Sequence, residues 1–357
     1  IAERMCKYWD VEIITTCALD YVTWANHYPE GEESLNGAKI NRFKVDNPRN
    51  INAFNELSDY LNSLEYIDNK LADKWMKAQG PFSSSMLDYI EDKKDTFNAF
   101  IFFTYLYAHT WFGLPKVRSK SILLPLAHDE WTIHLDIWKE LFQKVNKFVF
   151  NTDTEKEFLC SKFEEVKEGS VIGVTVNRPI NISPQIFRSN YNIQDDFIIY
   201  VGRVDPSKNC EQLFEYFLNV NVKKGVGPQH LIVLGKANMN IPQTSNIHHF
   251  GFVDETTKWS AIAASQFLVM PSLYESLSMV LLEAWAVSKP VLVNGECEVL
   301  VNQCRKSNGG FYYKNIEEYE LFNDALYSKH YSHIMGMNGY NFFQNNYNWN
   351  KIEKELN

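Results

Sequence analysis

The feature that most constrains the fold is an alternation of short apolar segments with longer segments of helical period. The short segments are rich in β-branched and aromatic residues, which is typical of buried strands. They occupy residues 11–15, 40–45, 98–103, 122–126, 147–150, 171–174, 197–201, 231–234, 247–250, 267–270 and 291–293. Amphipathic helices are expected between them, for example over 211–219, 256–264 and 279–287. The alternation predicts an α/β fold with parallel sheets and helices on both faces.

Two runs of this pattern in 357 residues predict two doubly wound domains. The stretch 182–196 has no clear period, so we assign residues 1–185 and 186–335 to the two domains. Residues 336–357 are expected to form a C-terminal helix that packs back toward the first domain. The chain opens on a helical pattern at residues 1–8, whereas a doubly wound domain normally starts with a strand and a turn. We therefore expect a strand and its loop to be missing upstream.

Composition excludes several classes of protein. The net charge of -9 argues against nucleic acid as a partner, and no window approaches eighteen uncharged apolar residues, so no membrane span is predicted. A small basic cluster, Lys116, Arg118 and Lys120, is most simply a solvated loop, although it leaves peripheral membrane contact open. The six cysteines form no C-x-x-C pair, which indicates neither a zinc site nor a redox dithiol and fits the cytoplasm.

The most informative stretch is PSLYESLSMVLLEAWAVSKPVLVN, residues 271–294. An apolar strand ends before a polar loop, and a helix is expected to start near Ser276 to Ser278, either of which could cap it. The free N–H groups at such a helix start form a diphosphate site. Glu275 precedes the helix and Glu283 lies inside it. Eight residues at 1.5 Å rise put these carboxylates roughly 12 Å apart at most, close to the span from a ribose to a sugar across a diphosphate.

Two glutamates separated by eight positions in a sequence are most often exposed surface residues. Glu283, however, stands in the apolar run MVLLEAWAV, where an unpaired charge is costly to bury, and this favours a functional role. The second motif is VGRVDPSKN, residues 201–209. Arg203 and Lys208 follow a buried strand there, and both side chains suit diphosphate oxygens, whose negative charge grows as the leaving bond breaks. The alternative for both cations is solvated surface charge.

In combination and order, GRVDPSK, HHFGFVDE and PSLYESLSMVLLEAWA resemble the carboxyl-terminal half of the retaining glycosyltransferases of family 4 (group 1), which have the GT-B fold. The resemblance is strong over residues 197–293 and looser elsewhere. It implies two Rossmann-like domains facing a central cleft, and a metal-independent transfer of sugar from a nucleotide-diphosphate donor, UDP- or GDP-linked. Glu275 and Glu283 match the family's E-x7-E signature. Where the family often has glycines after the first glutamate, this chain has Ser276 and Ser278.

The resemblance also implies roles for individual residues. Arg203 and Lys208 would contact the pyrophosphate, as would the backbone N–H groups of Ser276, Leu277 and Ser278. Glu275 would bind hydroxyls of the donor sugar, and Glu283 those of the ribose. Gly251 and Val253 would lie near the base.

In the first half, LPLAHDEW (residues 124–131) follows a strand. A histidine in such a loop is more often structural, but family members carry one that contacts the transferred sugar. His128 is therefore the candidate, with Asp129 orienting it. The loops 15–32 and 104–113 resemble the aromatic-rich loops of bacterial surface-polysaccharide glycosyltransferases. Tyr21, Trp24, Tyr105 and Trp111 could stack on acceptor sugars there, although packing is the commoner role for any one of them.

The sequence thus predicts a catalytic set of His128, Glu275, Arg203 and Lys208, with no metal and no cofactor beyond the donor. The reaction is expected to retain anomeric configuration, with a glycan or lipid-linked acceptor at or near the inner face of the membrane, as in polysaccharide biosynthesis. Three alternatives stay open. One is a nicotinamide oxidoreductase, weakened because Gly225-Val-Gly227 precedes a strand instead of following one. The others are a GT-B epimerase or phosphorylase, and a non-catalytic sugar-binding homologue.

Overall fold

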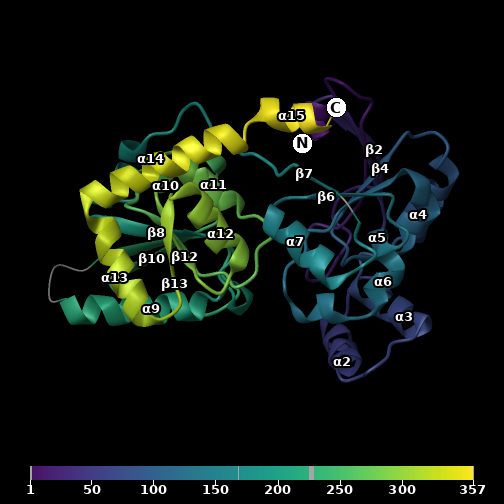
Figure 1. The fold of residues 1–357 in the computed structure, drawn as a ribbon, viewed down its shortest axis with the longest axis horizontal. Helices are drawn as coiled ribbons and strands as arrows, with labels where there is room; N and C mark the ends of the chain where they lie inside the picture. The colour runs from purple at the N-terminus through teal and green to yellow at the C-terminus, as the bar shows by residue number, and fades with distance from the viewer. Residues whose placement is uncertain (1, 168, 225–228, 357) are drawn as a thin grey trace. The chain divides into compact units, whose positions relative to one another are not determined.

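The computed structural model describes residues 2–167, 169–224 and 229–356. The chain forms two compact units, Ile1–Ile172 and Gly173–Asn357, called here the first and the second unit (Figure 1). The division falls before the predicted linker at 182–196. That stretch instead contains helix α8 (Pro184–Asn190), which starts because Ser183 accepts a hydrogen bond from the Ile186 N–H group and whose Phe187 is buried in the second unit. The Gly225-Val-Gly227 sequence lies outside the described residues.

The second unit is built on a six-stranded parallel sheet with the order β10-β9-β8-β11-β12-β13. Its strands are β8 (Phe197–Val201), β9 (His230–Leu234), β10 (Ile247–Gly251), β11 (Leu268–Met270), β12 (Val291–Asn294) and β13 (Gly310–Tyr313). The first five correspond to predicted strands, whereas β13 was not predicted. Its sequence, GFYY, begins at the second glycine of the pair Gly309-Gly310 and is too short to stand out as a period.

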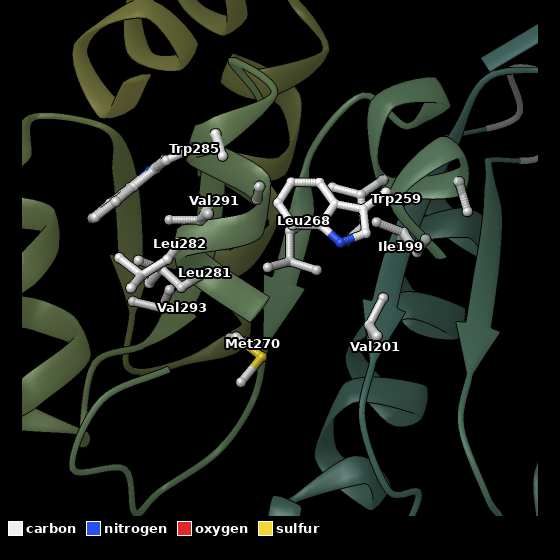
Figure 2. Close-up of a cluster of buried hydrophobic side chains, with 14 of the residues drawn as sticks. Ile199, Val201, Trp259, Leu268, Met270, Leu281, Leu282, Trp285, Val291 and Val293 are labelled. Carbon is white, nitrogen blue, oxygen red and sulfur yellow. The ribbon is translucent and has the colours of Figure 1, made fainter. Parts of the chain in front are cut away.

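Helices cover both faces of this sheet. They are α9 (Cys210–Lys224), α10 (Glu255–Ala264), α11 (Met279–Ala286), α12 (Glu298–Ser307), α13 (Ile316–Tyr327) and α14 (Lys329–Asn346), and α15 (Trp349–Leu356) follows them in the chain. Because side chains alternate along a strand, Ile199 and Val201 of β8 enter one core while Ile198 and Tyr200 enter another. Figure 2 shows the first of these cores, where Trp259 of α10 and Trp285 of α11 pack near the strands. The predicted doubly wound arrangement is confirmed here.

Helix α14 packs closely on α11 through two glycines. A Cβ atom on Gly339 would lie 2.1 Å from Cδ1 of Trp285, and one on Gly336 would lie 2.1 Å from the carbonyl oxygen of Ser288. Residues 336–346 therefore belong to α14 in the second unit. The sequence analysis had instead predicted that a separate helix begins at residue 336. The expected return of the terminal helix toward the first domain stays a prediction.

The first unit contains two sheets. Strands β4 (Phe100–Phe103), β5 (Ser121–Leu124), β6 (Lys147–Phe150) and β7 (Gly169–Val171) are parallel, in that order. Strand β1 (Glu12–Thr16) pairs parallel with β3 (Ala38–Phe43), and β3 pairs antiparallel with β2 (Gly31–Leu35). The expectation of parallel sheets throughout is therefore wrong for β2. Its GEESL sequence has every residue exposed, so it carries no apolar pattern to detect.

Short helices connect these strands and surround a core that contains Trp75 and Trp138. They are α1 (Ala2–Met5), α2 (Ile51–Asn62), α3 (Asn69–Gln79), α4 (Ser84–Lys93), α5 (Ala108–Gly113), α6 (Ile137–Phe142) and α7 (Asp153–Lys162), with 3-10 turns at Leu114–Lys120 and Trp131–His134. The carboxyl ends of β1, β4 and β5 lead into the segments that hold the polar and aromatic residues singled out from the sequence, Tyr21 and Trp24, Tyr105 and Trp111, and His128.

Substitution of Gly339 by Ala should destabilise the second unit, because the added methyl group overlaps the Trp285 ring. Overpacking of this kind typically costs about 1–3 kcal/mol, although Ala favours a helix by about 1 kcal/mol over Gly. The free energy of unfolding in urea should fall for G339A. The matched control is Asn341→Ala, an exposed position of the same helix, and equal stabilities for the two variants would contradict the packing described.

Candidate active site

The carboxyl edge of the second unit's sheet brings two strand ends unusually close together. A Cβ atom on Gly235, which follows β9, would lie 2.0 Å from the carbonyl oxygen of Gly202, which follows β8. Gly235 has a φ of 132°, a conformation that side chains disfavour. Glycine is therefore required at this point, and the chain leaving β8 can turn directly into the segment that carries Arg203 and Lys208.

Arg203 stands at the start of that segment. Its carbonyl oxygen accepts a hydrogen bond of 2.6 Å from the buried Tyr200 hydroxyl, which holds the backbone turn. Its guanidinium Nη1 lies 3.2 Å from Oδ2 of Asp205, and the side chain is 42% exposed. Arg203 is thus anchored by its backbone and oriented by a carboxylate, while its charged end remains in contact with solvent.

Lys208 and Glu275 meet although 67 positions separate them. Lys208 Nζ lies 2.7 Å from Glu275 Oε1, and both side chains are mostly buried. Two amides hold the neighbouring loops in register, because Asn209 and Asn294 both donate to the carbonyl oxygen of Pro271, at 3.2 and 3.1 Å. The structure therefore brings together two of the predicted site residues.

Helix α11 begins immediately after this ion pair. Ser278 is its N-cap, and the Ser278 hydroxyl accepts a hydrogen bond of 3.4 Å from the Leu281 N–H group. Of the two serines considered, Ser278 is therefore the cap, and Ser276 lies in the preceding loop with the buried Leu277 between them. Glu275 precedes the cap by three residues, so its carboxylate lies on the approach to the helix N-terminus.

Glu283 is buried inside α11, as its apolar surroundings predicted, but it is not unpaired. Lys258 of α10 donates to Glu283 Oε1 at 2.7 Å and to Glu255 Oε1 at 2.9 Å. The side chain of Glu283 is 8% exposed, and its Oε2 has no hydrogen-bond partner among the described residues. Burial raises the pKa of Glu283, and the hydrogen bond from Lys258 opposes that rise. The sequence analysis missed Lys258, whose amphipathic helix gives no sign of a buried partner.

The loop after β10 contains the predicted base contacts, Gly251 and Val253. Gly251 has a φ of 68° and open space where a Cβ atom would stand. Between the two lies Phe252, whose side chain is 90% exposed. An aromatic ring held in solvent at the carboxyl edge of a parallel sheet is a further candidate binding residue, which the sequence analysis did not single out.

In the first unit, His128 lies in a loop whose backbone is fixed by hydrogen bonds to Glu155. This buried carboxylate accepts hydrogen bonds of 2.8 Å from the N–H groups of Ala127 and Asn151, and so joins the loops that follow β5 and β6. Burial raises the pKa of Glu155 to about 7 against the opposing effect of these backbone donors. Leu126, which precedes Ala127 in this loop, has a φ of 54°, so the backbone of the loop is strained as well as anchored.

Asp129 does not orient His128, contrary to the prediction. Its Oδ1 lies 2.7 Å from Nε2 of His134, because the loop turns Asp129 outward. The carboxylate near His128 is that of Glu130, whose Oε1 lies 3.7 Å from Nδ1 of His128. Adjacent acidic residues cannot be told apart from sequence alone when the direction of the loop is unknown.

The four aromatic acceptor candidates separate into two groups. Tyr105 is buried and its hydroxyl lies 3.1 Å from that of Thr132, whereas Trp111 donates to Asp73 at 2.7 Å and packs edge-on against Trp138. Both therefore pack as part of the protein. Tyr21 is exposed, and Trp24 is half-buried in the loop after β1. Of these four candidates, Tyr21 and Trp24 in the loop after β1 are the ones placed to meet a ligand.

Other predictions concern charge and metals. Lys116 pairs with Glu91, Arg118 donates to the Gln143 carbonyl oxygen, and Lys120 donates to two carbonyl oxygens, so the basic cluster is part of the local structure. Across the described ranges, no group of three His, Cys, Asp or Glu side chains is arranged to hold a metal ion. In the same ranges, no helix is both long and apolar enough to cross a membrane.

Comparison with known proteins finds a family match within the second unit. Residues 182–328 match the family described as "Glycosyl transferases group 1". The match includes Arg203, Lys208, Glu275 and Glu283. No curated protein sequence matches the chain.

Solved structures show that the fold is GT-B. Sucrose-phosphate synthase from Thermosynechococcus elongatus superposes with a TM-score of 0.71 at 14% identity, covering 99% of this chain and 89% of that one. HepE from Anabaena, solved with UDP and glucose, gives 0.64 at 10% identity, covering 90% and 85%. Trehalose 6-phosphate synthase from Burkholderia multivorans gives 0.64 at 9% identity, covering 98% and 89%. Family and fold together support glycosyl transfer from a nucleotide-sugar.

Replacement of Lys258 by Met should be strongly destabilising, because it leaves Glu283 as an uncompensated buried charge. Breaking such a pair costs about 3–5 kcal/mol, to be measured by urea unfolding. The control is Glu255→Gln, which removes the other partner of Lys258. Glu255 is 71% exposed, so its loss should cost under about 1 kcal/mol. If K258M proves as stable as E255Q, the Lys258–Glu283 pair is not the buried contact described.

Replacement of Glu155 by Ala should leave the Ala127 and Asn151 N–H groups without their partner, at about 1–3 kcal/mol for each. Glu157→Ala, at an exposed position of the same helix, is the control. The folded-state pKa of about 7 lies above the ordinary value of Glu. Stabilisation by Glu155 is therefore fully present below about pH 4.3 and declines as the pH rises toward 7. The stability difference between wild type and E155A should shrink over that range, and a constant difference would contradict the raised pKa.

Proposed function

We propose that this protein is a retaining glycosyltransferase that moves a sugar from a UDP- or GDP-linked donor to a glycan or lipid-linked acceptor without a metal ion. The observation that carries the proposal is the 2.7 Å pair of Lys208 and Glu275 at the carboxyl edge of a parallel sheet and before the N-terminus of α11, with Lys208 on the same segment as Arg203. Two cations and a capped helix start form an anion site, and the carboxylate adds an acceptor for sugar hydroxyls.

In the proposed reaction the donor diphosphate lies against Arg203, Lys208 and the backbone N–H groups at residues 276–278. Negative charge grows on the leaving phosphate as its bond to the sugar C1 breaks. The two fixed cations stabilise that charge more in the transition state than in the ground state. They supply the positive charge that a metal ion would otherwise provide, which supports a metal-independent reaction.

Transfer with retention follows if the acceptor attacks on the face that the phosphate leaves. The new bond joins the acceptor oxygen to C1, and the acceptor proton passes to an oxygen of the leaving phosphate. Glu275 would accept hydrogen bonds from the hydroxyls of the donor sugar and so orient its ring. His128 of the first unit is proposed as a sugar-contacting residue.

The nucleoside is proposed to contact the other end of the site. Glu283 would accept a hydrogen bond from a ribose hydroxyl, which would supply the donor that Oε2 lacks. The exposed ring of Phe252, between Gly251 and Val253, would stack on the base. HepE was solved with UDP, which supports a nucleoside diphosphate as the ligand of this fold.

A sugar-binding homologue without catalytic activity is the second candidate. It requires the fold but not the charged pair, whereas Arg203, Lys208, Glu275 and Glu283 are all present and positioned by specific contacts. The observations therefore favour the enzyme over a homologue that only binds.

Nucleoside diphosphates should raise the melting temperature, because a ligand that binds only the folded state stabilises it by mass action, by about 2.7 kcal/mol at a hundred times Kd. UDP, GDP and ADP are compared at equal concentrations, with EDTA present throughout. We expect a shift with UDP or GDP that survives EDTA. No shift with any of the three would remove the donor site from the proposal.

Lys208→Ala and Glu275→Ala should each lower turnover of the identified nucleotide-sugar by roughly 10²–10³, the typical effect of removing a group that stabilises the transition state. Far-UV circular dichroism should remain that of the wild type. The control is the exposed pair Lys314 and Glu296, whose nitrogen and oxygen lie 3.7 Å apart on the same unit. Alanine at either control position should leave turnover unchanged, and near wild-type rates for both site variants would end the assignment.

A further inference from the structure

Arg49 of the first unit is a half-buried cation without a carboxylate partner. Its guanidinium is enclosed by two aromatic rings, with Cζ 5.2 Å from the centroid of Trp24 and 4.9 Å from that of Phe54. Its Nε donates to the carbonyl oxygen of Gln79 at 2.8 Å, and Nη2 donates to the Gln79 side-chain oxygen at 2.9 Å. Within the described ranges no carboxylate forms an ion pair with Arg49. Burial lowers the pKa of Arg49 against the opposing electrostatic effects of Tyr107, Tyr21 and Asp20, and a bound anion would favour the charged form further.

The loop beside Arg49 is held firmly. Asp20 accepts hydrogen bonds from the Val22 and Thr23 N–H groups at 2.8 and 2.7 Å and from the Thr23 hydroxyl, so its charge is engaged within its own turn. The Arg49 N–H group donates to the Thr23 carbonyl oxygen, which ties the loop after β3 to the loop after β1. Asp20 is near enough to be felt electrostatically by Arg49, but it does not pair with it.

Trp24 fixes the same loop from the other side. Its backbone is left-handed, with φ at 52°, and its indole N–H donates to the Gln79 carbonyl oxygen at 2.8 Å. A Cβ atom on Gly80 would lie 2.9 Å from Cδ1 of Trp24, so a glycine is needed under the ring. Trp24 also packs edge-on against Tyr107 of the loop after β4, with centroids 5.3 Å apart. A strained tryptophan held by four contacts indicates a preorganised surface.

Large apolar side chains are exposed on the two segments that the Arg49 N–H group ties together. Leu19, Tyr21 and Val22 in the loop after β1, and Ile51 two residues beyond Arg49, are between 39% and 57% exposed. Together with Arg49 and Trp24 they are called the Arg49 patch. Single exposed apolar residues are ordinary, whereas a group of them on a rigid turn beside a buried cation is typical of a binding surface.

We propose that the Arg49 patch binds the acceptor, and that this acceptor is a lipid-linked phosphate whose anionic group contacts Arg49 while its apolar chain covers Leu19, Val22 and Ile51. The charge selects the phosphate, and the exposed side chains select a chain in place of a free sugar phosphate. The patch lies at the carboxyl edge of β1 and β3, and Trp24 contacts Tyr107 in the loop after β4. Strand β5 pairs with β4, and the loop after β5 contains His128. The proposal rests on the transferase function proposed above.

Binding of three probes by isothermal titration calorimetry tests the patch. The probes are farnesyl phosphate below its micellar concentration, farnesol, which lacks the charge, and inorganic phosphate, which lacks the chain. The wild type should bind farnesyl phosphate at least about tenfold more tightly than either other probe, since a hydrogen bond to a charged group contributes about 1.5–3 kcal/mol. Equal affinity for farnesyl phosphate and farnesol would overturn the proposed role of Arg49. Equal affinity for farnesyl phosphate and inorganic phosphate would overturn the proposed role of the apolar side chains.

Two variants separate the contributions. Arg49→Gln should reduce the affinity for farnesyl phosphate to that for farnesol, and the double variant Leu19→Ser, Val22→Ser should reduce it to that for inorganic phosphate. The double variant changes only exposed side chains, so it decides the matter if R49Q fails to fold. The control is Tyr60→Ser, an exposed aromatic near the other end of α2, which should bind like the wild type. Wild-type affinity in the double variant would overturn the proposal.

The donor site provides an independent check. Thermal shifts with UDP and GDP should be unchanged in the Leu19→Ser, Val22→Ser variant, because these residues belong to the first unit and the donor site to the second. If the wild type shows a nucleotide shift but no preference for farnesyl phosphate, the patch proposal fails alone. If no nucleotide shifts the wild type, the proposed transferase function fails, whatever the probes show.

Discussion

Burial of both faces of the second unit's parallel sheet is the constraint on which the rest of this structure depends. Strands such as β8 and β11 are buried at every position and carry no charged side chain. The charged residues Arg203, Lys208 and Glu275 accordingly lie in the segments that follow strands. The requirement for glycine at Gly235 follows from the same packing, because a Cβ atom there would overlap the carbonyl oxygen of Gly202 at the exit of the neighbouring strand. A charged site at the carboxyl edge is the consequence of an apolar interior.

Charges placed so near an apolar core need partners, and the structure provides them in pairs. Glu275 is paired with Lys208 and Glu283 with Lys258. In the proposed reaction the first pair has to open in part, because Lys208 is shared between a carboxylate and a phosphate. The second pair can stay closed, since only one oxygen of Glu283 is engaged by Lys258. In this proposal the two glutamates of the E-x7-E signature would therefore act differently: Glu275 would exchange partners during the reaction, and Glu283 would keep its contact with Lys258.

The second unit could be predicted from sequence further than the first. Its strands are continuous apolar runs, and its motifs lie within a few residues of strand ends, so local pattern was enough to find Arg203, Lys208 and Glu275. Lys258 was missed because its partner is 25 residues away on another helix. In the first unit, β2 carries no apolar pattern, and Asp129 was preferred over Glu130 because the direction of the loop depends on distant contacts. The sequence around Tyr105 and Trp111 indicates exposed aromatic residues. In the folded chain, however, Tyr105 contacts Thr132, and Trp111 contacts Asp73 and Trp138.

The same distinction explains where specificity resides. A donor site that recognises a diphosphate can rely on a helix start and two cations, which short motifs encode and which tolerate changes elsewhere. The loops of the first unit are held by contacts far apart in sequence: Glu155 joins the ends of β5 and β6, and Gln79 receives both Arg49 and Trp24. Such loops can change their exposed residues while their anchors remain. A surface like the Arg49 patch can therefore be adapted to one acceptor without disturbing the site that binds the donor.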